Sequence, residues 1–204
     1  MRLMMCVLII ALSLTGCATG SGKSTHEEAA KITVTTVDLF KGDAEKFKPF
    51  LGNMSGSFKL NYKGTKPNAI LDVELWENGK KSKSLGSLFD IFWRSEKAKR
   101  NELEFIISID TTFVEGQDDL SEIKIVEKSE RGTNSYGFSH LWDKKIKAHG
   151  LISTRSPYTF PAKGDVHIWG MHATTTNQIR VSDFSPESLK NMETAIIVTL
   201  RFEE

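Results

Sequence analysis

The sequence predicts an all-β domain, an antiparallel β-sandwich of the immunoglobulin-like kind with one short helix before its last strand. From residue 32 onward, about ten short β-like segments follow one another at near-even spacing, with turn signals between them. Asn78-Gly79 is a strong signal for a two-residue hairpin turn. Ser185 as N-cap and Pro186 at the first helical position predict the short helix. A small closed β-barrel is the alternative fold.

In the first half of the domain, residues 57–63 and 70–77 alternate between apolar and polar side chains, which predicts one buried face on each strand. Trp76 lies opposite the apolar stripe of its strand, so we expect it either at an exposed or interfacial position or on a second buried face. The other segments expected here are strands at 32–40, 81–85 and 103–109, an irregular stretch with a helical turn at 41–53, an apolar segment at 88–93 and a charged connector at 94–101.

In the second half, residues 165–173 and 178–181 are expected to form a hairpin across the turn Thr174–Asn177. Asp143-Lys144-Lys145 is expected to join two neighbouring strands at a hairpin tip. The remaining strands are expected near 123–125 and at 136–142, 146–152 and 196–202.

The first seventeen residues have the pattern of an export signal. Arg2 precedes Leu3–Leu14, an apolar run that Ser13 alone interrupts. As a helix this run would be about 18 Å long, against about 30 Å for the hydrocarbon core of a bilayer. It is therefore too short to span a membrane stably and fits the apolar region of a signal peptide.

The run ends in Leu14-Thr15-Gly16-Cys17, which resembles the lipobox of bacterial lipoproteins. The resemblance implies that Cys17 receives a diacylglyceryl group and that the chain is cut between Gly16 and Cys17. It also implies a lipid anchor with acyl chains of the palmitate type. The diacylglyceryl group supplies two such chains, which is enough to hold a protein stably at a bilayer. The alternatives are an ordinary secreted protein, cut near residues 17–20, and an uncleaved, buried N-terminal helix.

The resulting division of the chain is a signal peptide at 1–16, a lipidated flexible tether at 17–31 and the sandwich at 32–204. Removing residues 1–16 takes away Arg2 and no acidic residue, so 26 Lys and Arg face 26 Asp and Glu. This neutral balance argues against nucleic acid as a partner. The only cysteines are Cys6 and Cys17, so the mature domain has no disulfide, no cysteine nucleophile and no thiolate metal ligand.

Several motifs that suggest chemistry fail on spacing. The segment Gly20–Thr25 looks like the end of a P-loop, but the first glycine of that motif is replaced by Cys17, so no nucleotide is expected. Ser139-His140 is followed by Leu141, whereas a nucleophile elbow needs glycine there. Asp118-Asp119 lacks the alternating ligands of a calcium loop. We therefore predict no catalytic residue and no cofactor.

His167 and His172 are five residues apart and would point to opposite faces of a regular strand. A bulge at Gly170 would bring them to one face and favour a metal site. In the alternative, one of these histidines is exposed and the other is partly buried and hydrogen-bonded. We adopt this alternative and therefore predict no metal site.

Basic clusters and tryptophans are the remaining candidates for recognition. Lys80–Lys83 and Lys144–Lys147 fall at expected hairpin tips, where lysines either dock on an anionic bilayer or cell-wall polymer or only protect exposed edges. A third cluster covers Arg94–Arg100. The four tryptophans are Trp76, Trp93, Trp142 and Trp169.

Taken together, these patterns predict a lipoprotein anchored on the extracytoplasmic face of the cell membrane or envelope, whose domain acts by binding. Its partner is expected to be an envelope protein, an envelope polymer or a small ligand, and the sequence names no binding residue. Two alternatives remain: an envelope enzyme or metal-binding protein that uses the late histidines, and a structural accessory of another membrane protein.

Overall fold

The computed structural model describes residues 30–52, 54–64, 68–92, 102–112, 117–129, 132–154 and 156–202. The predicted signal peptide, the lipidation site Cys17 and nearly all of the tether lie outside the described residues, as do Trp93 and Arg94–Arg100. No helix in the described ranges has the length and apolar character needed to cross a membrane.

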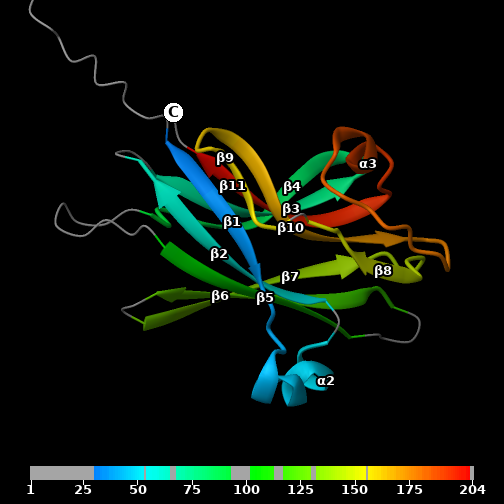
Figure 1. Cartoon of the computed structure of the whole chain (residues 1–204). Coiled ribbons are helices and arrows are strands. Elements are labelled where there is room, and N and C mark those ends of the chain that lie inside the picture. The colour runs from blue at the N-terminus through cyan, green and yellow to red at the C-terminus, as the bar shows by residue number, and fades with distance from the viewer. Residues whose placement is uncertain are drawn as a thin grey trace, which may run out of the picture.

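Two antiparallel sheets pack face to face (Figure 1). Sheet A has the strand order β7-β6-β5-β2-β1-β9, and sheet B has the order β4-β3-β11-β10-β8. The strands of sheet A are β1 (Lys31–Val37), β2 (Ser55–Lys63), β5 (Glu102–Thr112), β6 (Asp119–Ser129), β7 (Gly132–Trp142) and β9 (Tyr158–Pro161). The strands of sheet B are β3 (Ala69–Glu77), β4 (Lys80–Leu88), β8 (Ala148–Leu151), β10 (Gly164–Thr174) and β11 (Thr194–Phe202).

The predicted all-β sandwich is confirmed. Over the described residues each sheet has two edge strands, so the alternative of a closed barrel does not apply. Immunoglobulin constant domains place their first, second, fifth and fourth strands in one sheet and the third, sixth and seventh in the other. The present strand order differs, so the likeness to immunoglobulins lies in the packing of two sheets and not in the connections.

Alternation places the main core between the sheets. On β2 the side chains of Phe58, Leu60 and Tyr62 point inward and are buried, while Lys59 and Lys63 are exposed, as the sequence pattern predicts. The inward residues of the two sheets form one continuous apolar cluster. Burial of this apolar surface is the main force that holds the sheets together.

The central strands β3 and β11 of sheet B are buried on both faces, unlike the strands of sheet A. Six successive residues of β11, Ala195–Leu200, are all buried. The outer face of sheet B, which points away from sheet A, packs a second apolar cluster that includes Ile152, Leu189 and Met192. The covering segment, defined here as residues 178–192, contains the short helix α3 (Pro186–Lys190) and lies over this face (Figure 1).

The local turn signals are confirmed. Asn78 and Gly79 have φ angles of 51° and 73°, as the predicted hairpin turn between β3 and β4 requires. Ser185 caps α3, because its Oγ accepts a hydrogen bond from the backbone N–H of Ser188 at 3.3 Å. The expected helical turn between the first two strands is present as η1 (Gly42–Phe47) and α2 (Lys48–Leu51).

Two expected hairpins are wrong. Residues 178–181 are not a strand, and β10 pairs with β11 and β8 instead. The residues 143–147 do not form a hairpin tip, because β7 is an edge of sheet A and β8 is an edge of sheet B. The chain thus crosses between the sheets there. The sequence analysis also missed β9, a four-residue strand that pairs with β1.

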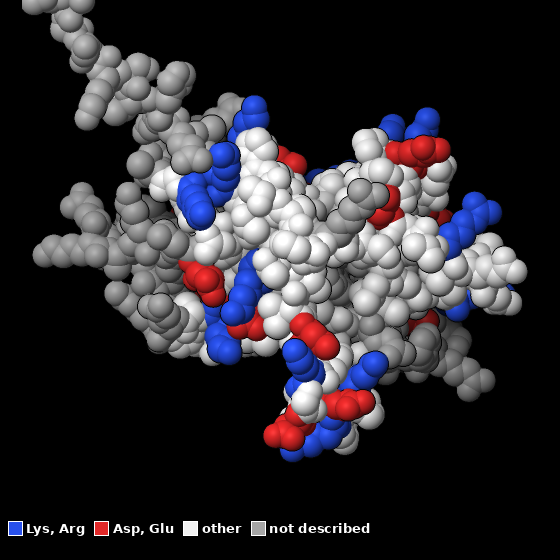
Figure 2. Space-filling model, in the orientation of Figure 1, with Lys and Arg blue, Asp and Glu red and all other residues white. Residues whose placement is uncertain are grey.

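The chain enters the sandwich at Lys31 and reaches the opposite end of β1 at Val37. η1 and α2 follow β1 at that opposite end and project from the sandwich (Figure 1), and the Asn78-Gly79 turn lies beside the link 143–147, because Asn78 and residues 143–146 line one pocket. Both basic segments predicted as tips lie there. Figure 2 shows Lys and Arg interspersed with Asp and Glu at the projecting η1 and α2, so neither sign of charge dominates this projection.

Candidate ligand-binding site on the outer face of sheet B

A β-bulge in β10 turns two histidines to the same side of sheet B. The pairing with β11 shifts just after His167, so that His167 lies opposite Thr199 and His172 lies opposite Ala195. Residues directly opposite in antiparallel strands share a face, and Thr199 and Ala195 are an even number of positions apart. Both histidines therefore point outward, away from sheet A.

This placement corrects the expectation of opposite faces for the two histidines. The bulge forms at Ile168 rather than at Gly170, the position considered from the sequence. The two histidines still do not meet, because His167 lines one cavity and His172 lines another. Within the described ranges, no group of three or more His, Cys, Asp or Glu side chains is placed to hold a metal ion.

Glu74 of β3 is a buried carboxylate that accepts four hydrogen bonds. Its side chain is 1% exposed. Lys81 Nζ and Arg201 Nη2 donate to Oε1 at 2.7 and 2.9 Å, while Trp76 Nε1 and Thr199 Oγ1 donate to Oε2 at 2.8 and 3.0 Å. A buried charge is tolerated only when it is paired and hydrogen-bonded, and these four donors meet that requirement.

Asp72 lies on the same face of β3, and its side chain is 2% exposed. It accepts hydrogen bonds from Ser84 at 2.5 Å, from Ser87 at 2.8 Å and from Lys81 at 2.8 Å. Burial by itself raises the pKa of Asp72, but these hydrogen bonds and the charge of Lys81 outweigh it and hold the pKa below the ordinary value of 3.8. Asp72 is therefore ionised at neutral pH.

The hydroxyl of Thr199 connects this acidic network to His167. A carboxylate can only accept hydrogen bonds, so the single hydroxyl proton of Thr199 is used in the hydrogen bond that Oγ1 donates to Glu74. The 2.9 Å contact between His167 Nδ1 and Thr199 Oγ1 must then be a hydrogen bond that Nδ1–H donates. This tautomer leaves Nε2 of a neutral His167 as an acceptor.

Burial lowers the pKa of His167 from its ordinary value of 6.5, and the charges of Glu74 and Asp165 oppose this shift only in part. The ring lies edge-on to Trp76, with 5.1 Å between the ring centroids, and 5.8 Å from the centroid of Phe184. His167 is therefore neutral at pH 7, and contacts with Trp76 and Phe184 hold its ring in place.

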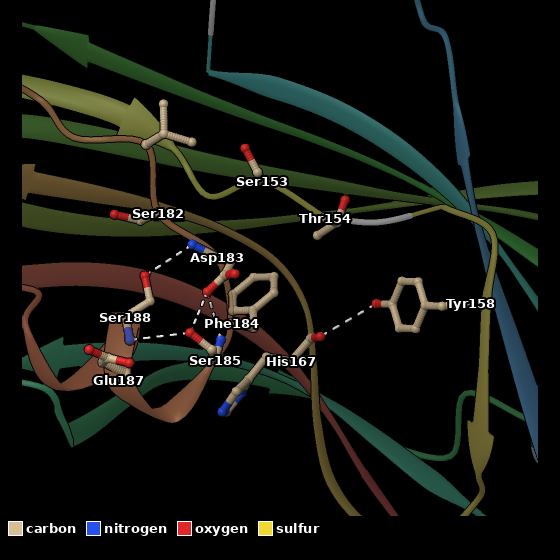
Figure 3. Close-up of a pocket in the computed structure, with 11 residues that line it drawn as sticks. Ser153, Thr154, Tyr158, His167, Ser182, Asp183, Phe184, Ser185, Glu187 and Ser188 are labelled. Carbon is tan, nitrogen blue, oxygen red and sulfur yellow. Dashed lines mark hydrogen bonds between the residues drawn. The ribbon is translucent and has the colours of Figure 1, made fainter.

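His167 lines a cavity of about 740 Å³, within the range of about 300–1,000 Å³ common for small-ligand sites. Its walls come from the end of β8, from β9 and β10 and from the covering segment. Figure 3 shows Tyr158 on one side of the cavity and the loop Ser182–Ser188 on the other. Six of the lining residues carry hydroxyl groups, two are acids, one is a histidine and two are apolar: Ser153, Thr154, Tyr158, His167, Val181, Ser182, Asp183, Phe184, Ser185, Glu187 and Ser188.

Part of this polar wall is held by its own hydrogen bonds (Figure 3). Ser185 Oγ donates to Asp183 Oδ1 at 2.5 Å, and Ser188 Oγ accepts from the backbone N–H of Asp183 at 3.1 Å. Tyr158 donates its hydroxyl to the carbonyl of His167 at 3.4 Å, and burial raises its pKa to about 12. The tyrosine therefore stays protonated, and the loop presents a fixed surface to the cavity.

The other histidines within the described ranges lie outside this cavity. Burial lowers the pKa of His140 and of His149, and both rings lie edge-on to Trp142, at 4.7 and 5.4 Å between centroids. The exposed Ser139 neighbours His140 on β7 and lies opposite Glu122 of β6. Nε2 of His172 is buried without a hydrogen-bond partner among the residues that the structure describes.

The structure also places the other candidates from the sequence. Trp76 is half-buried on the covered outer face of sheet B, which agrees with the expectation of a second buried face rather than an exposed position. Trp142 and Trp169 are buried. Lys81 is not a free cation at a tip, because its ammonium group pairs with Asp72 and Glu74. Of the described residues that the sequence analysis named as candidates for chemistry or recognition, His167 is the one that lines this cavity.

No family model matches this sequence, and no curated protein and no solved structure matches the chain. The function of the site therefore has to be inferred from its own geometry.

The sequence analysis missed Asp72, Glu74 and Thr199 as site residues. Alternation with Leu71, Val73 and Leu75 puts the two acids on the polar face of their strand, but alternation does not show that this face is buried. One signal was present: β11 is apolar at nearly every position, which indicates burial on both faces, and Thr199 is a polar residue within that run. The pairing of β11 with β3, which brings Thr199 to Asp72 and next to Glu74, was not visible in the sequence.

Proposed function

We propose that this protein is a lipoprotein anchored through Cys17 on the extracytoplasmic face of the membrane, and that its sandwich binds a ligand in the His167 cavity. The observation that carries the binding proposal is that the Glu74–Thr199–His167 chain of hydrogen bonds fixes the tautomer of a histidine that lines the cavity. The lipobox pattern supports the anchor. A buried network of this kind costs stability unless fully satisfied, so its placement beside a cavity favours a role in recognition.

The lining residues indicate the ligand class. Nε2 of a neutral His167 can accept a hydrogen bond, and the hydroxyls of Ser153 and Thr154 can both donate and accept one. Phe184 and Val181 offer apolar contact, while the carboxylates of Asp183 and Glu187 disfavour an anion. These groups fit a neutral moiety with hydroxyl and amide N–H donors, such as one N-acetylated sugar unit of an envelope polymer.

The binding proposal is tested with N-acetylglucosamine and its short oligomers as probes. Because Trp76 contacts His167, tryptophan fluorescence of the purified full chain reports occupancy of the cavity. We expect saturable binding that His167→Ala weakens at least tenfold and that His140→Ala, at a half-buried histidine outside the cavity, leaves unchanged. Equal binding by both variants would place the ligand elsewhere, and absence of binding would exclude this probe class.

The anchor is tested separately by intact mass and by detergent phase partition of the protein from its host. We expect the mature chain to begin at Cys17 with a diacylglyceryl adduct, and Cys17→Ala to abolish both the adduct and the partition into the detergent phase. A Cys17 that is unmodified and still joined to residues 1–16 would overturn the anchor and leave the cavity proposal standing.

A further inference from the structure

The four edge strands of the sandwich are not equally protected. Sheet A ends in β7 and β9, and sheet B ends in β4 and β8. An edge strand presents unpaired N–H and C=O groups that can template another strand. Proteins protect such edges by short length, lysine, proline or bulges.

Three of the edges carry these protections. β8 and β9 are four residues long, and β9 ends in Pro161. β4 carries Lys80, Lys81 and Lys83, and its pairing with β3 shifts register twice. Each of these strands is therefore a poor template for a partner strand.

β7 carries none of them. It is eleven residues long and contains no Lys, Arg, Asp, Glu or Pro. Its pairing with β6 runs without a register shift from Gly132 opposite Ser129 to Trp142 opposite Asp119. The result is a long, regular and uncharged edge.

No other described strand pairs with the free side of β7. Over the described residues, its backbone hydrogen-bonding partner in the sheet is β6 alone. β4 lies against the inward-facing side chains of β7, because the half-buried ring of Phe138, which packs against the main core, contacts Gly86 of β4. Side chains stand perpendicular to a sheet, so this contact places β4 on the inward side of β7 and not beside its edge.

We propose that β7 pairs antiparallel with β7 of a second copy of this chain and joins the two A sheets into one. A two-fold axis that runs between the two copies of β7, perpendicular to the joined sheet, makes the same edge self-complementary. Like charges directly opposite each other destabilise a strand pair, and a strand without charges avoids this in every register. The outward row of β7 is small and neutral around the middle, which suits close approach of a second copy: Thr133, Ser135, Gly137 and Ser139. This inference rests neither on the lipid anchor nor on the cavity.

Sedimentation equilibrium of the full chain in density-matched detergent micelles is the first test. The wild type is expected to dimerise reversibly, and Ser135→Lys/Ser139→Lys to weaken dimerisation at least tenfold, because it places four positive charges at the joined edge. Ser139 faces Glu122 within the monomer, so the added lysine at that position does not disturb the fold.

Two control variants accompany this test. Ser135→Thr/Ser139→Thr is the neutral control, and Thr112→Lys adds charge at the exposed end of the inner strand β5. Both are expected to remain dimeric. A monomeric wild type, or a dimer indifferent to the β7 lysines, would overturn the proposal.

A cysteine scan gives a second readout that does not depend on weakening the protein. Cys6 and Cys17 are the only cysteines of the sequence, so a cysteine introduced into the domain is its only one. Thr133, Ser135, Gly137 and Ser139 are replaced one at a time, and disulfide-linked dimer is quantified after mild oxidation. In an antiparallel self-pair, a residue meets its own copy only near the two-fold axis, so we expect one maximum with a steep fall on both sides. Uniform cross-linking, or none, would contradict strand pairing.

Discussion

Thr199 Oγ1 lies 3.0 Å from Oε2 of Glu74, so a buried hydroxyl donates a hydrogen bond to a buried carboxylate. The direction of this one bond decides the next one, because the same oxygen can then only accept from His167 Nδ1 at 2.9 Å. Glu74, a residue of β3 whose side chain is 1% exposed, thereby determines the tautomer of His167, which lies on β10 and lines the cavity.

Replacing Thr199 by Val keeps the side-chain shape and removes the hydroxyl. We expect the free energy of unfolding to fall by about 1–3 kcal/mol, because a buried Nδ1–H loses its acceptor and Glu74 loses one donor. Urea denaturation measures this loss, and nitrogen NMR of the imidazole checks the tautomer. In the wild type the proton should reside on Nδ1, while the variant should show a mixture of tautomers.

Thr194→Val is the matched control for that substitution. Thr194 lies on the same strand, is half-buried and donates to the carbonyl of Trp76 at 3.2 Å, where it touches neither Glu74 nor His167. We expect a loss of about 1 kcal/mol or less and an unchanged imidazole spectrum. A changed tautomer in this control, or an unchanged one in Thr199→Val, would show that the hydroxyl does not set the proton position.

Glu74→Gln removes the charge that faces Lys81 and Arg201 while keeping the side-chain volume. Breaking a buried ion pair costs about 3–5 kcal/mol, and we expect the lower end because both cations are about a third exposed to water. Glu122→Gln removes an exposed pair with Lys124 at 3.7 Å and should cost less than about 1 kcal/mol. Chemical denaturation compares the two variants, and equal losses would mean that burial of Glu74 contributes nothing special.

The histidines predict how stability changes with pH. Burial lowers the pKa of His140, His149, His167 and His172 below the ordinary value of 6.5. Below about pH 6.5 the unfolded chain therefore binds more protons than the folded chain, and the free energy of unfolding falls as the pH falls. Above that pH these groups contribute no pH dependence.

Urea midpoints at pH 7.5 and pH 5.5 measure this effect, and we expect the lower midpoint at pH 5.5. His172→Gln should reduce the difference between the two midpoints, because it removes one group whose pKa is lower in the folded state than in the unfolded state. A midpoint that rises toward pH 5.5 would contradict the lowered pKa values.

Two glycines on facing strands predict opposite responses to the same change. A Cβ on Gly86 of β4 would collide with the ring of Phe138, whereas a Cβ on Gly137 of β7 would meet nothing within 4 Å. Gly86→Ala should therefore cost about 1–3 kcal/mol through overpacking. Gly137→Ala should be neutral or slightly stabilising, since it reduces the freedom of the unfolded chain. Thermal unfolding of both variants measures this difference.

Local pattern was sufficient for most of the fold. Alternation located the buried faces of β2 and β5, and the short-range preferences of Asn78-Gly79 and Ser185-Pro186 located a turn and a helix start. These features depend on neighbours within a few residues. Pairing depends on distant residues, which is why the hairpin expected between 165–173 and 178–181 was wrong.

The candidate site was predictable only in part, because its residues come from different strands. His167 was noticed for its neighbour His172, yet its partners are Thr199 and Trp76, on β11 and β3. A one-residue bulge at Ile168 reverses the faces of all the residues after it. No sequence pattern fixed where that bulge forms.

The sequence by itself determined the class of fold and the Asn78-Gly79 turn, because both follow from alternation and backbone preference over short stretches. It also carries the whole argument for the anchor at Cys17, since that argument is a linear pattern of charge, apolar length and small residues. Only the tertiary structure decided that Asp72 and Glu74 are buried, which acceptor His167 uses and which edge strand is left unprotected. Those properties arise when segments far apart in the chain exclude water from the same place, and that proximity is set by packing rather than by neighbouring residues.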